Sequence, residues 1–122
     1  MVVYIGRITY KMCARFNQKI TSTEIQRFFE AAGDVFDELT ARINTAPTQS
    51  VLAISGVNPR ILGEYRWGLI PFWAKDINFG RRTFNARSET IATKPAFRAA
   101  FRSRRCLVPV AGFYEWTGPK GS

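Results

Sequence analysis

Apolar residues at helical spacing mark the first long element of the chain. They recur every three or four positions, at Ile25, Phe28, Phe29, Ala32, Phe36 and Leu39. Thr21 and Glu24 have the spacing of a capping box, in which two side chains satisfy N–H groups at a helix start. The pattern predicts a helix over residues 22–41, with Gly33 as a weak point in its middle.

Strand patterns follow in the middle of the chain. Val51–Ile54 and Ile61–Trp67 are apolar or alternating runs, and the segment Ser55–Arg60 between them is rich in turn formers. Residues 1–11 alternate loosely, which fits either a strand or a tail. The two central runs therefore predict adjacent strands.

The last third of the chain combines a short helix with a strand. Pro95 is tolerated in a first helical turn, and Phe97 and Phe101 are four residues apart, so a short helix is predicted from about Pro95. Cys106–Trp116 predicts a largely buried strand with a break from Pro109 to Gly112. The fold class that follows is α+β with a mainly antiparallel sheet.

Composition narrows the class of protein. The 122 residues make one domain or part of one, with 46% hydrophobic and 22% charged residues. No apolar run approaches the roughly 20 residues that cross a bilayer, and the first residues make a poor secretory signal. Two cysteines and no histidine exclude a disulfide framework and the usual zinc patterns. We expect a cytoplasmic, nucleoid-associated protein without a metal, a cofactor or a membrane partner.

Positive charge gathers in the second half of the chain. The formal net charge is +9, and residues 81–122 hold 9 basic against 2 acidic residues. Arginine, which supplies 13 of the 18 basic residues, suits bidentate phosphate contacts and stacking on bases. The charge favours a nucleic-acid partner, although a solvated basic face that maintains solubility is the alternative.

Three segments carry candidate chemistry, and each has a structural alternative. Trp67–Trp73 is either core and rigid turn or an aromatic platform for bases. Asn85–Thr90 is either a polar loop tip or, through Arg87, a phosphate contact. Glu115 lies among aromatic residues, so it either faces solvent or is a desolvated acid of raised pKa that transfers protons.

Five segments in order resemble the SOS-response-associated peptidase (SRAP) family, whose members trap abasic sites in single-stranded DNA. These segments are Met12–Phe16, Asn44–Pro47, Trp67–Trp73, Asn85–Thr90 and Arg104–Trp116. The resemblance covers nearly the whole chain from Met12. It implies an α+β fold with a barrel-like, mainly antiparallel sheet and flanking helices.

The resemblance implies covalent chemistry at Cys13. In the family the cysteine after the initiator Met becomes the first residue, so it offers both an amine and a thiol. The amine condenses with the aldehyde of a ring-opened abasic sugar, and the thiol then closes a thiazolidine, which links protein and DNA. The imine also permits strand cleavage by β-elimination. Cys106 is expected to be a buried structural residue instead.

Other family positions carry over one at a time. Asn85 matches an Asn that bonds near the reacting sugar, and Glu115 matches the acid that opens the sugar ring and assists proton transfer. The positions that match DNA-contacting residues are Arg15, Asn44, Pro47, Trp73 and Arg87. The arginines would contact phosphates, the Asn44–Pro47 loop would line the site, and the tryptophan would stack on or wedge against a base.

The chain departs from the family pattern at both ends. We expect residues 1–11 to be an extension or a pro-segment, and residues 12–122 to be an SRAP domain whose C-terminal part, including the family's histidine, is missing. While the extension remains, Cys13 has no free amine. Unpaired strand edges would permit self-association. The alternative functions are a cysteine-type peptidase, acting even on its own N-terminus, and a non-catalytic single-stranded nucleic-acid-binding module.

Overall fold

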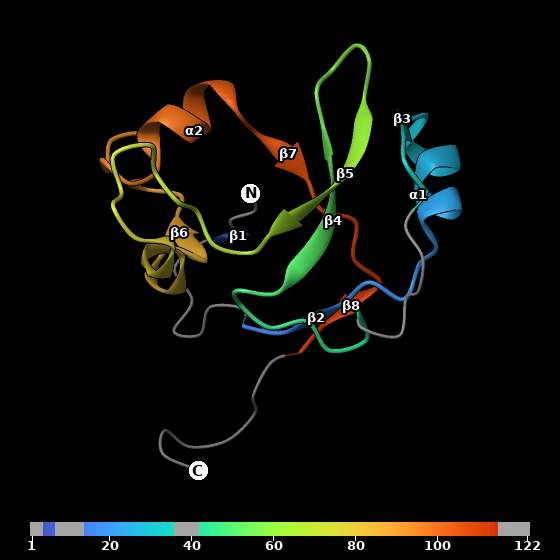
Figure 1. The fold of residues 1–122 in the computed structure, drawn as a ribbon, viewed down its shortest axis with the longest axis horizontal. Coiled ribbons are helices and arrows are strands. Elements are labelled where there is room, and N and C mark those ends of the chain that lie inside the picture. Colours follow the sequence, from blue (N-terminus) through green and yellow to red (C-terminus); the bar gives the residue numbers. More distant parts are fainter. Residues whose placement is uncertain (1–3, 7–13, 36–41, 115–122) are drawn as a thin grey trace.

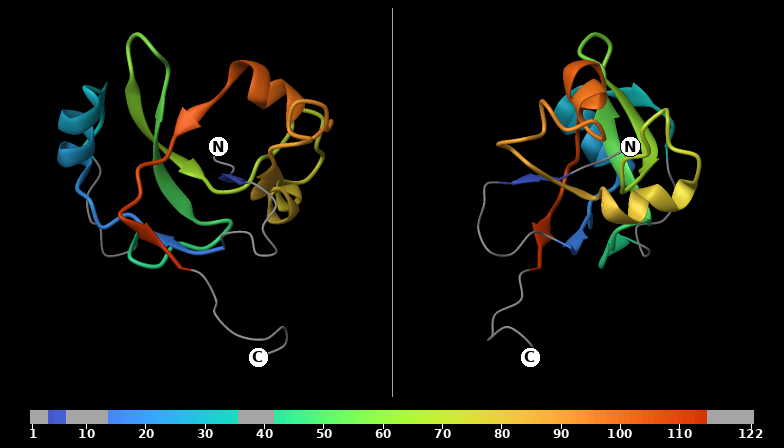
Figure 2. Two further views of the ribbon diagram at one scale, coloured as in Figure 1. Left: turned by 180° about the vertical axis from the view of Figure 1, so that it is seen from behind. Right: turned by 90° about the vertical axis from the view of Figure 1, so that its left-hand side faces the viewer.

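The computed structural model describes residues 4–6, 14–35 and 42–114. Short helices and strands alternate along these residues (Figures 1 and 2). In chain order the elements are β1 (Tyr4–Gly6), β2 (Phe16–Asn17), α1 (Ser22–Phe29), β3 (Ala32–Gly33), β4 (Ser50–Ser55), β5 (Ile61–Arg66), the 3-10 helix η2 (Ile77–Arg82), β6 (Asn85–Arg87), α2 (Arg98–Ser103), β7 (Cys106–Leu107) and β8 (Gly112–Phe113). The α+β prediction is confirmed.

The described strands form three separate sheets. The largest has the order β3-β5-β4-β7, while β1 pairs with β6 and β2 pairs with β8. The β4–β5, β4–β7 and β2–β8 pairs are antiparallel, whereas the β1–β6 and β3–β5 pairs are parallel. The expectation of a barrel-like sheet is therefore wrong for the described residues, where mixed small sheets form no closed barrel. A barrel needs one continuous ladder, and most of these strands have only two or three residues.

The central strand β4 is buried on both faces. Val51 and Ala53 point into one cluster with Phe16 and Trp67, while Leu52 and Ile54 point into another with Ile25 of α1. Figure 1 shows α1 on one side of the four-stranded sheet and α2, β6 and η2 on the other. The alternating residues of β4 thus contribute to both hydrophobic clusters, one on each face of the strand.

Helix α1 is shorter than its apolar pattern predicts. The capping box is confirmed, because Thr21 Oγ1 accepts from the Glu24 N–H and Glu24 Oε2 accepts from the Thr21 N–H, at 3.0 and 2.8 Å. The helix nevertheless ends at Phe29, where Glu30 turns left-handed with φ 51°. Gly33, at φ +120°, lies in β3 so close to β5 that a Cβ would collide with the Leu62 carbonyl oxygen. The predicted helix to residue 41 is therefore wrong beyond Phe29, and residues 36–41 lie outside the described ranges.

The capping box gives a stability prediction. Thr21→Ala should cost about 1 kcal/mol of unfolding free energy, because the first helical turn loses an acceptor. Thr23→Ala, an exposed substitution inside α1, is the matched control and should change little. Denaturant titrations of both variants at pH 7 measure the difference, and equal stabilities would contradict the assignment.

The same box should make stability depend on pH. The backbone N–H of Thr21, followed by its side chain, holds the pKa of Glu24 below the ordinary value of 4.5. A lowered folded-state pKa contributes stability above the unfolded pKa, and that contribution is lost as the pH falls through the folded value. The difference in midpoint between the protein and Glu24→Gln should therefore shrink as the pH falls from 7 to below the folded pKa.

The last third of the chain confirms the break at Pro109 but not the buried strand. Helix α2 begins at Arg98, later than expected, and Phe97 and Phe101 pack together in a third cluster with Ala86 of β6. The predicted strand over residues 106–116 is two short strands in different sheets, β7 and β8. Both are edge strands, and Leu107 and Phe113 are 57% and 60% exposed. Residues 115 and 116 lie outside the described ranges.

Candidate functional site

Strand β2 brings the segment after Cys13 next to two other predicted site segments. Phe16 pairs with Thr45 through two backbone hydrogen bonds of 3.2 and 2.8 Å, and its other neighbour is Phe113 of β8. Beside this ladder, a guanidinium N–H of Arg15 donates to Asn44 Oδ1 at 3.3 Å. The structure therefore joins Arg15 and Asn44, which are 29 residues apart in the chain.

An aromatic row connects β2 with β6. The rings of Phe16 and Trp67 have centroids 4.8 Å apart, and Trp67 lies edge-on to Phe84 at 6.2 Å. The indole N–H of Trp67 donates to the Phe84 carbonyl oxygen at 2.9 Å. Asn85 follows directly in β6, where its side chain is partly buried, and Arg87 is exposed at the end of the strand. The row fixes where β6 lies relative to β2.

Strand β1 lies in the segment predicted to be an extension. It pairs in parallel with β6, in a register that sets Tyr4 opposite Asn85 and Gly6 opposite Arg87. Residues 4–6 are thus a strand, which is one of the two structures that the sequence allowed. They occupy one edge of the strand that carries two of the predicted site residues.

The predicted aromatic platform divides into core and surface. Trp67 is core at 1% exposure, whereas Trp73 is 46% exposed. Trp73 meets Phe79 of η2 edge-on, with centroids 5.2 Å apart, and the Arg82 guanidinium lies 5.3 Å from the centre of the Phe79 ring. Phe79 and Arg82 therefore support Trp73. Neither supporting residue was predicted from the sequence. An aromatic residue and an arginine three positions apart in a basic segment were a usable signal for such a contact.

The loop that contains Pro47 is anchored on the buried tryptophan. The Thr48 N–H donates to the Trp67 carbonyl oxygen at 2.8 Å, and the Trp67 N–H donates to the Gln49 carbonyl oxygen at 2.9 Å. Pro47 itself is half-buried. The structure thus connects the Asn44–Pro47 loop with both β2 and Trp67, while Trp73 lies farther along the chain beside η2.

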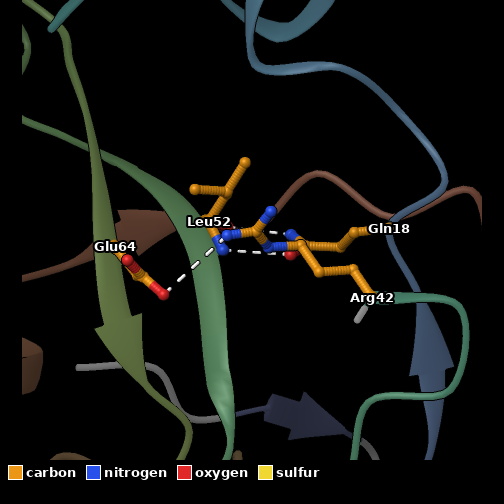
Figure 3. Close-up of polar contacts among 4 residues, drawn as sticks. All are labelled: Gln18, Arg42, Leu52 and Glu64. Carbon is orange, nitrogen blue, oxygen red and sulfur yellow. Dashed lines mark hydrogen bonds and ion pairs between the residues drawn. The ribbon is translucent and has the colours of Figure 1, made fainter. Parts of the chain in front are cut away.

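Gln18 ties the site to the central sheet and was missed by sequence reasoning. Its side-chain amide donates to the carbonyl oxygens of Leu52 and Pro109 at 2.8 and 2.7 Å, and its Oε1 accepts from the Leu52 N–H at 2.9 Å. Figure 3 shows the Gln18 amide against β4, next to the Arg42 guanidinium. Buried Arg42 reaches Glu64 of β5 at 3.8 Å. No periodic pattern in the sequence distinguishes this glutamine.

The two cysteines and Glu115 are the remaining residues with predicted roles. Cys13 and Glu115 lie outside the described residues, so their predicted roles stay predictions. Cys106 is half-buried against the cluster around Trp67, and burial raises the pKa of its thiol. A raised pKa leaves less thiolate at neutral pH, which makes Cys106 a poor nucleophile.

In the described part of the chain, no three or more Cys, Asp or Glu residues gather closely enough to hold a metal ion. None of its helices has the length and apolar character that a bilayer crossing requires.

Comparison with known proteins identifies the family. The family described as "SOS response associated peptidase (SRAP)" matches residues 12–122, which is most of the chain. The chain belongs to the SRAP family. The match begins at Met12, the residue before Cys13, so the first eleven residues precede the SRAP region.

Several curated SRAP proteins resemble the chain. Abasic site processing protein YoaM of Bacillus subtilis is 45% identical over 113 residues, which are 91% of this chain and 46% of that protein. YoqW of Bacillus phage SPbeta is 42% identical over 113 residues and is covered to 47%. Rat HMCES is 42% identical over 67 residues, which are 52% of this chain and 19% of that protein. The chain spans about half the length of the bacterial and phage relatives, or less.

Solved structures share the fold. A protein from Bacteroides thetaiotaomicron superposes with a TM-score of 0.76 at 24% identity, over 90% of this chain and 51% of its own. A Bordetella bronchiseptica protein superposes with a TM-score of 0.63 over 84% of this chain and 50% of its own. The chain therefore shares its fold with about half of each of these larger proteins.

Proposed function

We propose that this SRAP chain recognises abasic sites in single-stranded DNA and links to them covalently through Cys13 once that residue is the N-terminus. The observation that carries the proposal is the family match, which begins at Met12; this start supports the proposal that Cys13, the next residue, is the reactive cysteine. The names of YoaM, YoqW and HMCES, all abasic site processing proteins, support the substrate.

The chemistry is a condensation that releases one water. The Cys13 amine adds to the C1′ aldehyde of the ring-opened sugar, and loss of water from the carbinolamine gives an imine. The Cys13 thiolate then adds to the imine carbon and the nitrogen takes up a proton, which closes the five-membered thiazolidine. Aldehyde and aminothiol thus become thiazolidine and water, and no oxidant or metal takes part.

Glu115 is the proposed proton carrier for these steps. Two described residues near these positions support this role. The Tyr114 N–H donates to the Arg15 carbonyl oxygen at 2.9 Å, so the segment before β2 and the segment after β8 lie side by side. Cys13 is two residues before Arg15, and Glu115 directly follows Tyr114. The proposal therefore has Cys13 and Glu115 act on one sugar from the ends of these two neighbouring segments.

Asn85 is the proposed hydrogen-bonding partner of the reacting sugar. Its backbone position is supported by the row from Phe16 through Trp67 to Phe84, which connects β2 with β6. The row thus sets where β6, which begins at Asn85, lies relative to β2, the strand that follows the proposed nucleophile. Phe16 and Trp67 are buried and Phe84 is partly buried, so packing holds the row in place.

Arg15, Asn44, Pro47, Arg87 and Trp73 are the proposed DNA contacts. The hydrogen bond between Arg15 and Asn44 holds the Arg15 guanidinium beside the Asn44–Pro47 loop. The edge-on contact with Phe79 restrains the exposed Trp73 ring, which favours stacking on a base. Aromatic stacking accepts any base, whereas the arginines bind phosphates. The proposed ligand is therefore single-stranded DNA of any base sequence.

Arg87 gives a binding prediction. Arg87→Ala should weaken binding to single strands of different sequence alike and flatten the slope of log K against log salt by about 0.7, the value for one lost phosphate contact. Arg27→Ala, on the last turn of α1 beyond the sheet, is the matched control. Fluorescence anisotropy across a salt series measures both. An Arg87→Ala slope equal to that of the parent would contradict the phosphate role.

Self-processing is a second candidate activity, favoured by the family description as a peptidase and by the residues that precede Met12. In this reaction the Cys13 thiol adds to the Met12 carbonyl carbon, the acyl group passes from the Cys13 nitrogen to its sulfur, and water hydrolyses the thioester. Residues 1–12 then leave as a peptide with a free carboxylate, and the Cys13 amine and thiol are free. Intact mass spectrometry of the protein as purified and after incubation detects the loss of residues 1–12. Turnover of unrelated peptides would instead favour a general peptidase.

The test of the proposed function is adduct formation with DNA that contains one abasic site. A protein that begins at Cys13 should give a band on a denaturing gel and a mass equal to protein plus oligonucleotide minus one water. A chain that binds the same DNA without any adduct would be a non-catalytic binding module, and the proposal would be wrong.

A further inference from the structure

Arginines gather where α2 runs into β7, away from the residues already assigned. Three hollows lie along this surface, with volumes of about 540, 380 and 400 Å³. The first is lined by Arg98 and Arg102, the second by Arg104 and Arg105, and the third by Arg105 and Arg60. All five side chains are exposed. We refer to Arg60, Arg98, Arg102, Arg104 and Arg105 as the arginine tract.

One stacking contact makes the tract continuous. The Arg105 guanidinium lies 5.5 Å from the centre of the Phe101 ring, and Phe101 lines the first hollow while Arg105 lines the other two. This cation–π contact restrains the Arg105 guanidinium beside the Phe101 ring. A guanidinium can form two parallel hydrogen bonds to one phosphate group.

The charge of the tract is not compensated locally. Among the described residues, no Asp or Glu lines any of the three hollows. The second hollow adds hydroxyl groups, since Tyr65 Oη donates to Ser55 Oγ at 3.0 Å beside Arg104 and Arg105. Several like charges with hydroxyl groups between them attract a partner that carries repeated negative charges.

The tract is also connected with the proposed reaction site. Phe97 and Phe101 pack in one cluster with Ala86, which lies between Asn85 and Arg87 in β6. Figure 1 shows α2 and β6 on the same side of the central sheet. The tract and β6 are therefore parts of one packed unit.

We propose that the arginine tract binds the phosphodiester backbone of the nucleic-acid strand outside the abasic site, as a second contact region. The identity of the strand rests on the proposed function, whereas the phosphate chemistry rests on the tract itself. The tract contributes affinity without base preference, because the hollows offer guanidinium and hydroxyl groups to phosphates.

The test compares two double variants that lose the same charge. Arg102→Gln with Arg104→Gln removes two tract residues, and Lys19→Gln with Arg27→Gln removes two exposed positive charges near α1, beyond the sheet. Glutamine keeps a helix propensity close to that of arginine, and thermal melts check that both variants fold. The ligand is an intact, labelled oligonucleotide without an abasic site, and the chain of 122 residues is used.

The tract variant should lower the slope of log K against log salt by about 1.4, the value for two lost single-strand phosphate contacts, whereas the α1-side variant should leave it near the parent slope. Equal slopes for the two variants would overturn the proposal. Adduct formation is scored separately, with proteins that begin at Cys13 and a short abasic oligonucleotide. A slope difference without any adduct keeps the tract and rejects the proposed function, whereas adducts with equal slopes reject the tract alone.

Discussion

A protein that begins at Cys13 should form a stable adduct with abasic single-stranded DNA, whereas the 122-residue chain should form none. In the longer chain the Cys13 nitrogen is an amide, so it cannot form the imine. Its thiol alone gives a hemithioacetal, which reverts in water. On a denaturing gel the protein that begins at Cys13 should therefore give an adduct band and the 122-residue chain none. This difference in adduct yield is larger than the loss of any single contact at the site would cause.

The described extension adds a second reason for this contrast. Strand β1 pairs along β6 from Asn85 to Arg87, so residues 4–6 take up one edge of the proposed site strand. Removing residues 1–12 frees that edge and the amine together. Circular dichroism of both proteins checks that the shorter one keeps its secondary structure.

Two variants of the shorter protein separate the chemical steps. Cys13→Ser keeps the amine and loses the thiol, so it should give an adduct only when borohydride reduces the imine. Glu115→Gln should slow adduct formation by about 10²–10⁴, the usual contribution of a general acid–base group. A strong, unreduced band from the chain that still carries Met1–Met12, with its mass unchanged, would refute the aminothiol mechanism.

Local sequence signals predicted the elements whose determinants are local. The capping box of Thr21 and Glu24 and the paired strands β4 and β5 depend on residues close together in the chain, and the structure has all of them. The helix was extended too far because periodicity carries no information about Glu30, whose left-handed turn stops α1. Two-residue strands such as β2 and β3 depend on partners far away in the chain, so no local pattern predicts them.

The candidate site residues were named by a different route, namely resemblance to a family, and their roles stay predictions. The structure joins two of them, Arg15 and Asn44, through a hydrogen bond. The supporting residues were not named, because Phe79 and Arg82 act only through Trp73. Support of this kind is a property of the packed fold, so it becomes visible only when the ring contacts are known.

Gln18→Met should destabilise the protein by about 3–5 kcal/mol, the largest stability effect that we expect from one substitution. The side chain is fully buried, and methionine has a similar size without the amide. Two carbonyl oxygens and one N–H, from Leu52 and Pro109, would lose their partner, at roughly 1–3 kcal/mol for each buried group left unsatisfied. For a domain whose total stability is about 5–15 kcal/mol, this is a large fraction.

The position of Gln18 connects this stability effect with function. Strand β7 pairs with β4 only at Ile54 and Ser55, and the Gln18 amide bonds β4 two residues farther on, at Leu52. The same amide holds Pro109 in the connection between β7 and β8. Loss of the amide should therefore loosen β2 and β8 together, and with them the segments from which Cys13 and Glu115 are proposed to act.

Gln49→Met is the matched control for Gln18→Met. Gln49 is exposed and its side-chain Oε1 accepts a hydrogen bond from the Ala46 N–H at 2.9 Å, so its replacement should cost about 1 kcal/mol or less. Urea titrations give the two unfolding free energies, and adduct yield from proteins that begin at Cys13 gives the functional effect. Gln18→Met should lower both the unfolding free energy and the adduct yield. Gln49→Met should change neither by much. A Gln18→Met protein as stable as the control would show that the buried amide does not hold β2 against the central sheet.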